Sequence, residues 1–230
     1  MLRSCSDPGS RQADQGATWG MQVSILDAKS TARRLSALIQ KHDRIFIAVA
    51  WGGITSVADT LLANKAKFES VLLGVDFCAT DPDLIDRLVD VPNAYVAKKR
   101  PGCFHPKIFY FESGNTAEAI VGSANFTKGG LGRNLEAGVH VKGAVEYPFF
   151  EQVREQLDRY HPLCLPITQP LADSYRRQYR AAGGSPRPKN PVLPGEGKHW
   201  TSFNSPLAIM SWKEFARQAR QDLHQDYKKV

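Results

Sequence analysis

The sequence predicts an α/β protein with a mixed central sheet and helices on both of its faces. Residues 44–51 form an uninterrupted apolar run of strand length, the pattern of a strand that is covered on both sides, and residues 70–77 are expected to be a second buried strand. Amphipathic segments alternate with these runs, as in proteins whose sheet carries helices on its faces. Two further β-rich runs, residues 104–111 and 117–121, are separated by a short Gly/Asn loop, which predicts a hairpin.

Each element follows from a local pattern. Leu35, Leu38 and Ile39 are spaced so that they share one face of a helix. Asp81 followed by Pro82 is typical of a helix start, with aspartate as N-cap and proline in the first turn. We expect helices at residues 27–41, 54–64, 81–90 and 145–160, and strands at residues 44–51, 70–77, 93–97, 104–111, 117–121 and 135–141. We also expect a turn at residues 126–131, a connection at residues 161–171 and a short basic helix at residues 172–182.

The composition along the chain predicts four parts. Residues 1–20 are polar and are expected to be a disordered extension, so Met21 is a second candidate for the first residue of the protein. Residues 21–170 hold the predicted elements and form the main domain. Residues 171–198 are expected to be a basic linker, because prolines and glycines gather in their second half. Residues 199–230 carry a capping-box helix signal, and they are either a docking arm or the start of a further domain.

Composition also limits the class of protein. Hydrophobic residues make up 42% of the sequence, which is ordinary for a soluble globular protein. No apolar run is long enough to span a membrane, and the first residues lack the apolar segment of a secretory signal. The four cysteines are scattered without a CxxC pair or metal-finger spacing. We therefore expect a cytoplasmic protein with reduced thiols.

The net charge of +7 is unevenly distributed. Residues 171–230 contain eleven Lys and Arg against five Asp and Glu, so almost all of the positive excess lies there. A basic segment of this kind fits nucleic acid or another polyanion. The alternative is a basic tail that is only solvated, and composition leaves both open.

One stretch carries the candidate chemistry. His105 and Lys107 are two residues apart, so on a strand they point to the same face. Residues 122–125 (Gly-Ser-Ala-Asn) end the next run in a small polar turn that lets an anion approach the backbone. Glu136 follows in an otherwise apolar segment, where an unpaired carboxylate is costly. Each residue has a structural explanation taken alone, but together they suit the chemistry of a phosphate ester.

These residues carry a family resemblance. His105-Pro106-Lys107, then Gly122-Ser123-Ala124-Asn125, then Glu136 resembles the HxK…GSxN signature of the phospholipase D-like (HKD) superfamily. The order of elements resembles that family over residues 29–160, and the specific part is confined to residues 105–136. There are two departures: Glu112 stands where the family has aspartate, and the loop before Gly122 is three residues longer. The resemblance implies a phospholipase D-like fold, a mixed central sheet flanked by helices.

The resemblance also implies roles. His105 would attack phosphorus and form a phosphohistidine, a reaction that suits a side chain with a pKa near neutrality. Lys107 and Asn125 would donate to the non-bridging oxygens, and Ser123 would assist them. Glu136 would accept a hydrogen bond from His105 and hold its orientation. No metal and no other cofactor is expected, because lysines and amides supply the positive field.

The superfamily site uses two copies of the motif, and this chain has one complete copy. His140-Val141-Lys142 also fits HxK, but no GSxN follows it, so we interpret it as a strand end. We therefore expect a homodimer that places two His105 side chains together. Single-motif members of the family resemble bacterial endonucleases and a metal-independent restriction nuclease. The prediction is an endonuclease of restriction or defence type with nucleic acid, most simply DNA, as its partner.

Nearby cations are candidates for contact with the substrate. Lys99 and Arg100 lead into the motif, and Lys128 and Arg133 flank it, although exposed charges of this kind are also common on solvated surfaces. Trp51 either belongs to the core or stacks on a base. Two other functions stay open: a phospholipid hydrolase or phosphatidyl transferase, and a non-catalytic module that binds nucleic acid or protein.

Overall fold

The computed structural model describes residues 20–183. The predicted N-terminal extension, most of the predicted linker and the predicted C-terminal helix at residues 199–230 lie outside the described residues. Within residues 20–183 no helix is both long and apolar enough to cross a bilayer. The cytoplasmic location stays a prediction.

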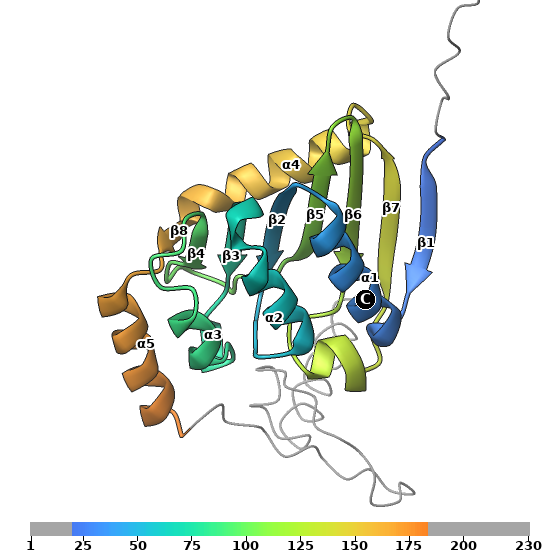
Figure 1. Ribbon diagram of the computed structural model, residues 1–230. Helices are drawn as coiled ribbons and strands as arrows, with labels where there is room; N and C mark the ends of the chain where they lie inside the picture. The colour runs from blue at the N-terminus through green and yellow to red at the C-terminus, as the bar shows by residue number, and fades with distance from the viewer. Residues whose placement is uncertain (1–19, 184–230) are drawn as a thin grey trace, which may run out of the picture.

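A mixed sheet of eight strands lies at the centre, in the order β1-β7-β6-β5-β2-β3-β4-β8 (Figure 1). β2, β3 and β4 pair in parallel, and the remaining neighbours pair antiparallel. The strands are β1 Gln22–Leu26, β2 Arg44–Val49, β3 Phe68–Leu73, β4 Ala94–Ala97, β5 Lys107–Ser113, β6 Thr116–Gly122, β7 Gly138–Ala144 and β8 Cys164–Pro166. The predicted α/β class with a mixed central sheet is confirmed.

Helices cover both faces of this sheet, with α4 on one side and the other long helices opposite (Figure 1). The helices are α1 Ala28–Lys41, α2 Ser56–Ala63, α3 Pro82–Asp86, α4 Pro148–Tyr160 and α5 Gln169–Ala181. Single turns of 3₁₀-helix occur at Lys65–Lys67, Asp76–Cys78 and His161–Leu163, and a π-helical turn at Gly129–Arg133.

Strand β2 divides the core into two parts. Its alternate side chains Ile45, Ile47 and Val49 pack with α1, α2, α3 and α5, whereas Phe46 and Ala48 pack with α4. Successive side chains of a strand point to opposite faces, so an unbroken apolar run is needed here. The predicted doubly covered strand is therefore confirmed.

Some predicted boundaries were wrong. The strand predicted at residues 70–77 ends at Leu73, because Gly74 passes so close to β2 that a Cβ there would lie 2.4 Å from the carbonyl oxygen of Ala50. The chain then turns, and Phe77 has a positive φ of 60°. The strand predicted from residue 135 begins only at Gly138.

Both edge strands, β1 and β8, were missed by the sequence analysis. Val23 and Ile25 of β1 are exposed, so this strand has no continuous apolar pattern. β8 is three residues long and ends in Pro166, and proline is tolerated in sheets at such edges. Short strands covered on one side carry little of the signal that identifies a central strand.

Helix α5 confirms the short basic helix, and it crosses the domain boundary predicted at residue 170. Ala172 and Tyr175 are buried in the core. The Tyr175 hydroxyl donates a hydrogen bond of 2.6 Å to the carbonyl of Thr80. The first part of the predicted linker therefore packs against the main domain.

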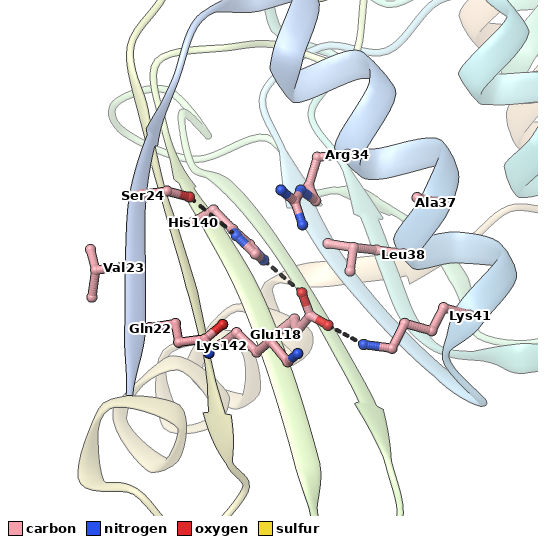
Figure 2. A pocket seen from close by; sticks show the side chains of 10 residues that line it. All are labelled: Gln22, Val23, Ser24, Arg34, Ala37, Leu38, Lys41, Glu118, His140 and Lys142. Carbon is pink, nitrogen blue, oxygen red and sulfur yellow. Dashed lines mark hydrogen bonds and ion pairs between the residues drawn. The ribbon is translucent and has the colours of Figure 1, made fainter. Parts of the chain in front are cut away.

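Two buried glutamates tie the sheet to its surroundings. Glu118 on β6 accepts hydrogen bonds from Lys41 and, at 2.7 Å, from His140 (Figure 2). It also accepts a hydrogen bond from His42. His140 therefore lies inside β7 with a buried partner, and not at a strand end as predicted.

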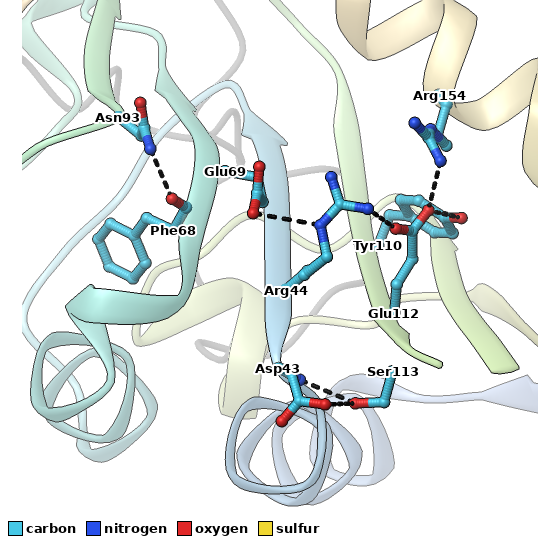
Figure 3. A network of polar contacts seen from close by, with 9 residues as sticks. All are labelled: Asp43, Arg44, Phe68, Glu69, Asn93, Tyr110, Glu112, Ser113 and Arg154. Carbon is cyan, nitrogen blue, oxygen red and sulfur yellow. Dashed lines mark hydrogen bonds and ion pairs between the residues drawn. The ribbon is translucent and has the colours of Figure 1, made fainter. Parts of the chain in front are cut away.

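Glu112 on β5, at the position where the family has aspartate, accepts from Arg44, Arg154 and the Tyr110 hydroxyl (Figure 3). Glu112 lies one residue before the end of β5, remote from Lys107 at its start. Glu112 thus has a structural role, and the change from aspartate leaves the motif residues untouched.

Candidate active site

The motif residues meet at one edge of the sheet, where β2, β3 and β6 end and β5 and β7 begin. Val49 at the end of β2 pairs with Lys107 at the start of β5. Gly122 at the end of β6 pairs with Gly138 at the start of β7. Adjacent strand ends therefore bring together segments that lie far apart in the sequence.

His105 and Lys107 contact each other, although not in the way the sequence predicted. β5 begins at Lys107, so His105 precedes the strand and is exposed, whereas Lys107 is only 7% exposed. The Lys107 ammonium folds back and lies 2.7 Å from Nδ1 and 3.0 Å from Nε2 of His105. It also donates to the His105 carbonyl at 3.1 Å.

This contact sets the charge of both groups. Burial lowers the pKa of Lys107 to about 8, against the smaller opposing effects of Cys103 and Glu136. Partial burial, and then the positive charge of Lys107, lower the pKa of His105 below its ordinary value. At neutral pH a neutral imidazole, which can act as a nucleophile, thus lies beside an ammonium group that is still charged.

Trp51 forms one wall of the site. Its ring meets the His105 ring edge-on, with centroids 5.2 Å apart and planes at 77°. The Lys107 ammonium lies 5.9 Å from the Trp51 centroid, within the range of a cation–π contact. Among the described residues the buried indole Nε1 has no hydrogen-bond partner. Trp51 is therefore part of the site.

The loop that carries Asn125 is fixed by its backbone. Phe126 N–H donates to the Trp51 carbonyl at 3.0 Å, and Gly53 N–H donates to the Phe126 carbonyl at 2.9 Å. Gly130 packs against Asn125 so closely that a Cβ would lie 2.3 Å from the Asn125 carbonyl oxygen. The buried Asn125 Oδ1 finds no hydrogen-bond donor in the part of the chain that the structure describes.

Ser123 and Glu136 form a pair of their own. The Ser123 hydroxyl donates to Glu136, and it accepts from the Ala137 N–H at 3.0 Å. Asn134 Nδ2 donates to the other carboxylate oxygen of Glu136 at 3.0 Å. The predicted hydrogen bond from His105 to Glu136 is not formed within residues 20–183, because Lys107 occupies the His105 ring and Glu136 precedes β7.

A known protein family matches the segment that carries these residues. A sequence model of the family described as cardiolipin synthase, PLD-like domain, matches residues 87–161, a segment that contains the whole motif. This segment, about a third of the chain, is similar to the phospholipase D-like superfamily. No curated protein sequence matches the chain significantly.

Several solved structures are similar to this chain. The phospholipase D family member Nuc from Salmonella typhimurium is 18% identical, with a TM-score of 0.50, over 65% of this chain and 99% of Nuc. NucT from Helicobacter pylori is 16% identical, with a TM-score of 0.49, over 64% and 99% of the two chains. Phosphatidylserine synthase from Haemophilus influenzae Rd KW20 is 14% identical, with a TM-score of 0.46, over 70% and 42%. The phospholipase D-like fold predicted from the motif is confirmed by the match to Nuc.

The candidate substrate-binding cations differ in whether their side chains already contact other residues of the fold. Lys99, Lys128 and Arg133 are exposed and form no hydrogen bond or ion pair with any described residue. Arg100 is instead engaged within the fold: it donates to a backbone carbonyl at 2.8 Å, and its guanidinium lies 5.1 Å from the centroid of the Phe104 ring. All four remain candidates for substrate contact, and Arg100 is in addition held within the fold.

Two residues of the phospholipase D-like site were missed by the sequence analysis. Asn134 donates a hydrogen bond to Glu136. The only feature of the sequence that could have indicated this contact is the position of Asn134 two residues before Glu136. Gly130 fixes Asn125 through a close backbone approach that one sequence cannot reveal. Within residues 20–183 no group of three or more His, Cys, Asp and Glu is arranged to hold a metal ion. Metal independence stays a prediction.

Proposed function

We propose that this phospholipase D-like protein is a metal-independent phosphodiesterase, an endonuclease that forms a phosphohistidine. The superfamily generally catalyses phosphodiester hydrolysis or transfer. The observation that carries the proposal is the contact between the neutral imidazole of His105 and the buried ammonium of Lys107. A nucleophile and a preorganised positive charge at one strand end are what an attack on a phosphodiester requires.

The proposed reaction has two displacements. A ring nitrogen of His105 forms a bond to phosphorus, and the bond from phosphorus to the leaving oxygen breaks while a general acid protonates that oxygen. Water then attacks phosphorus, gives its proton to the same group and frees His105. Lys107 and the Asn125 amide donate to the non-bridging oxygens, and the Ser123–Glu136 pair fixes the turn beside them.

The general acid is the reason to propose a homodimer. His42 and His140 are bound to the buried Glu118, and His161 packs its ring on Tyr95 with centroids 4.6 Å apart. Among the described histidines only His105 contacts Lys107. A second copy of the chain would supply its own His105 as general acid across a two-fold axis.

Free cations support nucleic acid, most simply DNA, as the substrate. Lys99, Lys128 and Arg133 are exposed without ionic partners among the described residues, and residues 171–230 carry most of the net positive charge. Neutralising several phosphates supplies most of the affinity of a non-specific nuclease. A phosphatidyl transferase is the second candidate, because the matching family model is described as cardiolipin synthase, PLD-like domain.

The test is incubation of the full chain with labelled DNA, RNA and phospholipid vesicles in EDTA. We expect cleavage of nucleic acid, trapping of the label on protein, and loss of both in His105→Ala. His161→Ala removes another exposed histidine and is the matched control.

Turnover of vesicles alone would select the transferase. Binding of DNA without turnover by any form of the protein would select a non-catalytic module. Sedimentation tests the dimer, since a monomeric protein with full activity would contradict the shared site.

A further inference from the structure

A second hollow lies at the other end of the sheet. It has a volume of about 340 Å³ and opens between α1 and the strands β1, β6 and β7 (Figure 2). Its buried centre, Glu118, is four residues before Gly122 on β6, which corresponds to roughly 13 Å along the strand. The hollow is therefore separate from the catalytic edge, by which we mean the edge of the sheet that carries His105, Lys107 and Asn125.

The only described carboxylate in its lining is already occupied. One oxygen of Glu118 accepts from Lys41 and from His42, and the other accepts from His140. Burial acts to raise the pKa of Glu118, but hydrogen bonds from His140, His42 and Lys41 outweigh it and hold this pKa well below its ordinary value. Glu118 thus stays ionised, orients the groups around it and has little capacity left for a ligand.

The groups that remain free in the hollow are donors. Arg34 and Lys142 line it, and neither forms an ion pair or hydrogen bond with any residue in the range 20–183. Lys142 lies directly opposite Glu118 on one neighbouring strand and Gln22 on the other. The Ser24 hydroxyl, 3.4 Å from His140 Nδ1, completes the set. Figure 2 shows these side chains facing one hollow.

Charge then decides the class of ligand. Arg34, Lys41 and Lys142 contribute three positive charges to the lining, and Glu118 contributes one negative charge. Guanidinium, ammonium, amide and hydroxyl donors converging on one space match an anion with several oxygens. A cation would find no free carboxylate among the described lining residues, since Glu118 is already occupied.

We propose that the hollow between α1 and β7 is a binding site for a phosphate group, held by Arg34, Lys142, Gln22 and Ser24. Two sources share this chemistry: a small phosphorylated molecule, or a backbone phosphate of a nucleic acid that extends away from the catalytic edge. The proposal does not rest on the proposed nuclease activity, because no residue of the catalytic edge takes part.

The test is a titration of the full chain with inorganic pyrophosphate, followed by the NMR signals of the His140 and His105 imidazoles. We expect a saturable shift of the His140 signal in the wild type. Arg34→Gln with Lys142→Gln should weaken this response at least about tenfold, since two charge-assisted contacts are lost. The His105 response, which reports any binding at the catalytic edge, should not change.

The matched control is Lys29→Gln with Arg33→Gln, which removes two exposed charges from the same helix but from outside the hollow. The control pair should bind as the wild type does. An unchanged His140 signal, or equal weakening in both double variants, would overturn the proposal, since diffuse charge would then explain any binding.

The same variants with a short single-stranded oligonucleotide separate the two sources. Weaker oligonucleotide binding in Arg34→Gln with Lys142→Gln, and not in the control pair, assigns the site to a backbone phosphate. Weakening confined to pyrophosphate assigns it to a small ligand.

Discussion

The two ends of strand β5 carry buried ionisable groups that are treated in opposite ways. Glu112 near the end of the strand accepts from two arginines and a tyrosine, so its charge is fully compensated. Lys107 at the start is equally buried, yet no described carboxylate pairs with it, and its nearest polar contact is His105. The same strand thus holds one satisfied charge and one that is left open.

This difference separates structure from chemistry. A buried charge without a partner costs free energy, so folding alone gives no reason for Lys107 to be there. The Trp51 Nε1–H, on a ring whose centroid lies 5.9 Å from the Lys107 ammonium, is buried without a partner among the described residues and costs further free energy. A substrate phosphate could accept from the Lys107 ammonium and from the Trp51 Nε1–H, whereas nothing remains for a ligand to satisfy at Glu112.

The largest expected effect comes from removing the open charge. Lys107→Met should reduce turnover about 10³-fold, because a preorganised donor to the transition state is lost. It should leave stability equal or higher, because an unpaired buried charge is replaced by an apolar side chain. Turnover and urea denaturation measure the two effects. Lys98→Met, on the exposed segment before the site, is the control, and activity retained in Lys107→Met would remove Lys107 from the mechanism.

The comparison also predicts a pH dependence. The folded-state pKa of Lys107, about 8, is below its ordinary value of 10.5, so between these values the unfolded chain binds more protons. Stability relative to Lys107→Met should therefore rise from about pH 8 to 10.5. Turnover should instead fall as the pH rises through 8, because Lys107 loses its charge. Turnover should also fall at a pH below 6.5, where the His105 imidazole becomes protonated. An alkaline limb that persists in Lys107→Arg would assign it to another group.

The smallest expected effect on catalysis comes from a change of Glu112, whose charge is fully paired. Glu112→Gln should lower the free energy of unfolding by about 2 kcal/mol, since Arg44 and Arg154 lose a charged partner but remain half-exposed to water. Turnover per folded molecule should not change. Glu69→Gln, whose carboxylate meets only the exposed side of Arg44, should cost less than about 0.5 kcal/mol. Thermal unfolding measures the loss of stability in each variant. A loss of turnover in Glu112→Gln would contradict the purely structural role assigned to Glu112.

The fold could be predicted as far as its patterns are periodic or apolar. The central strand from Arg44 and the helix with Leu35, Leu38 and Ile39 follow from spacing alone. Strand β1 could not be predicted, because its side chains Val23 and Ile25 face outward and the pattern depends on a partner strand more than 110 residues later.

The site could be predicted as a set of residues, but its internal contacts could not. The spacing of His105 and Lys107 located the chemistry, yet the side chains meet because Lys107 folds back from the first position of β5. Glu136 was placed beside the histidine, and its actual partners are Ser123 and Asn134. A motif gives the types and order of the residues. Their hydrogen-bond partners depend on the geometry of the loops, which cannot be read from the residues of the motif.

Helix α5 has a practical consequence for handling the protein. Tyr175 holds the carbonyl of Thr80, and the Thr80 hydroxyl in turn bonds to the backbone of Gly74 and Gly52, the turns that support Trp51. A chain that ends at residue 170 would lose Tyr175, and with it the hydrogen bond to Thr80 that supports the turns beneath Trp51. A fragment made for crystallisation or assay should therefore retain at least Gly183.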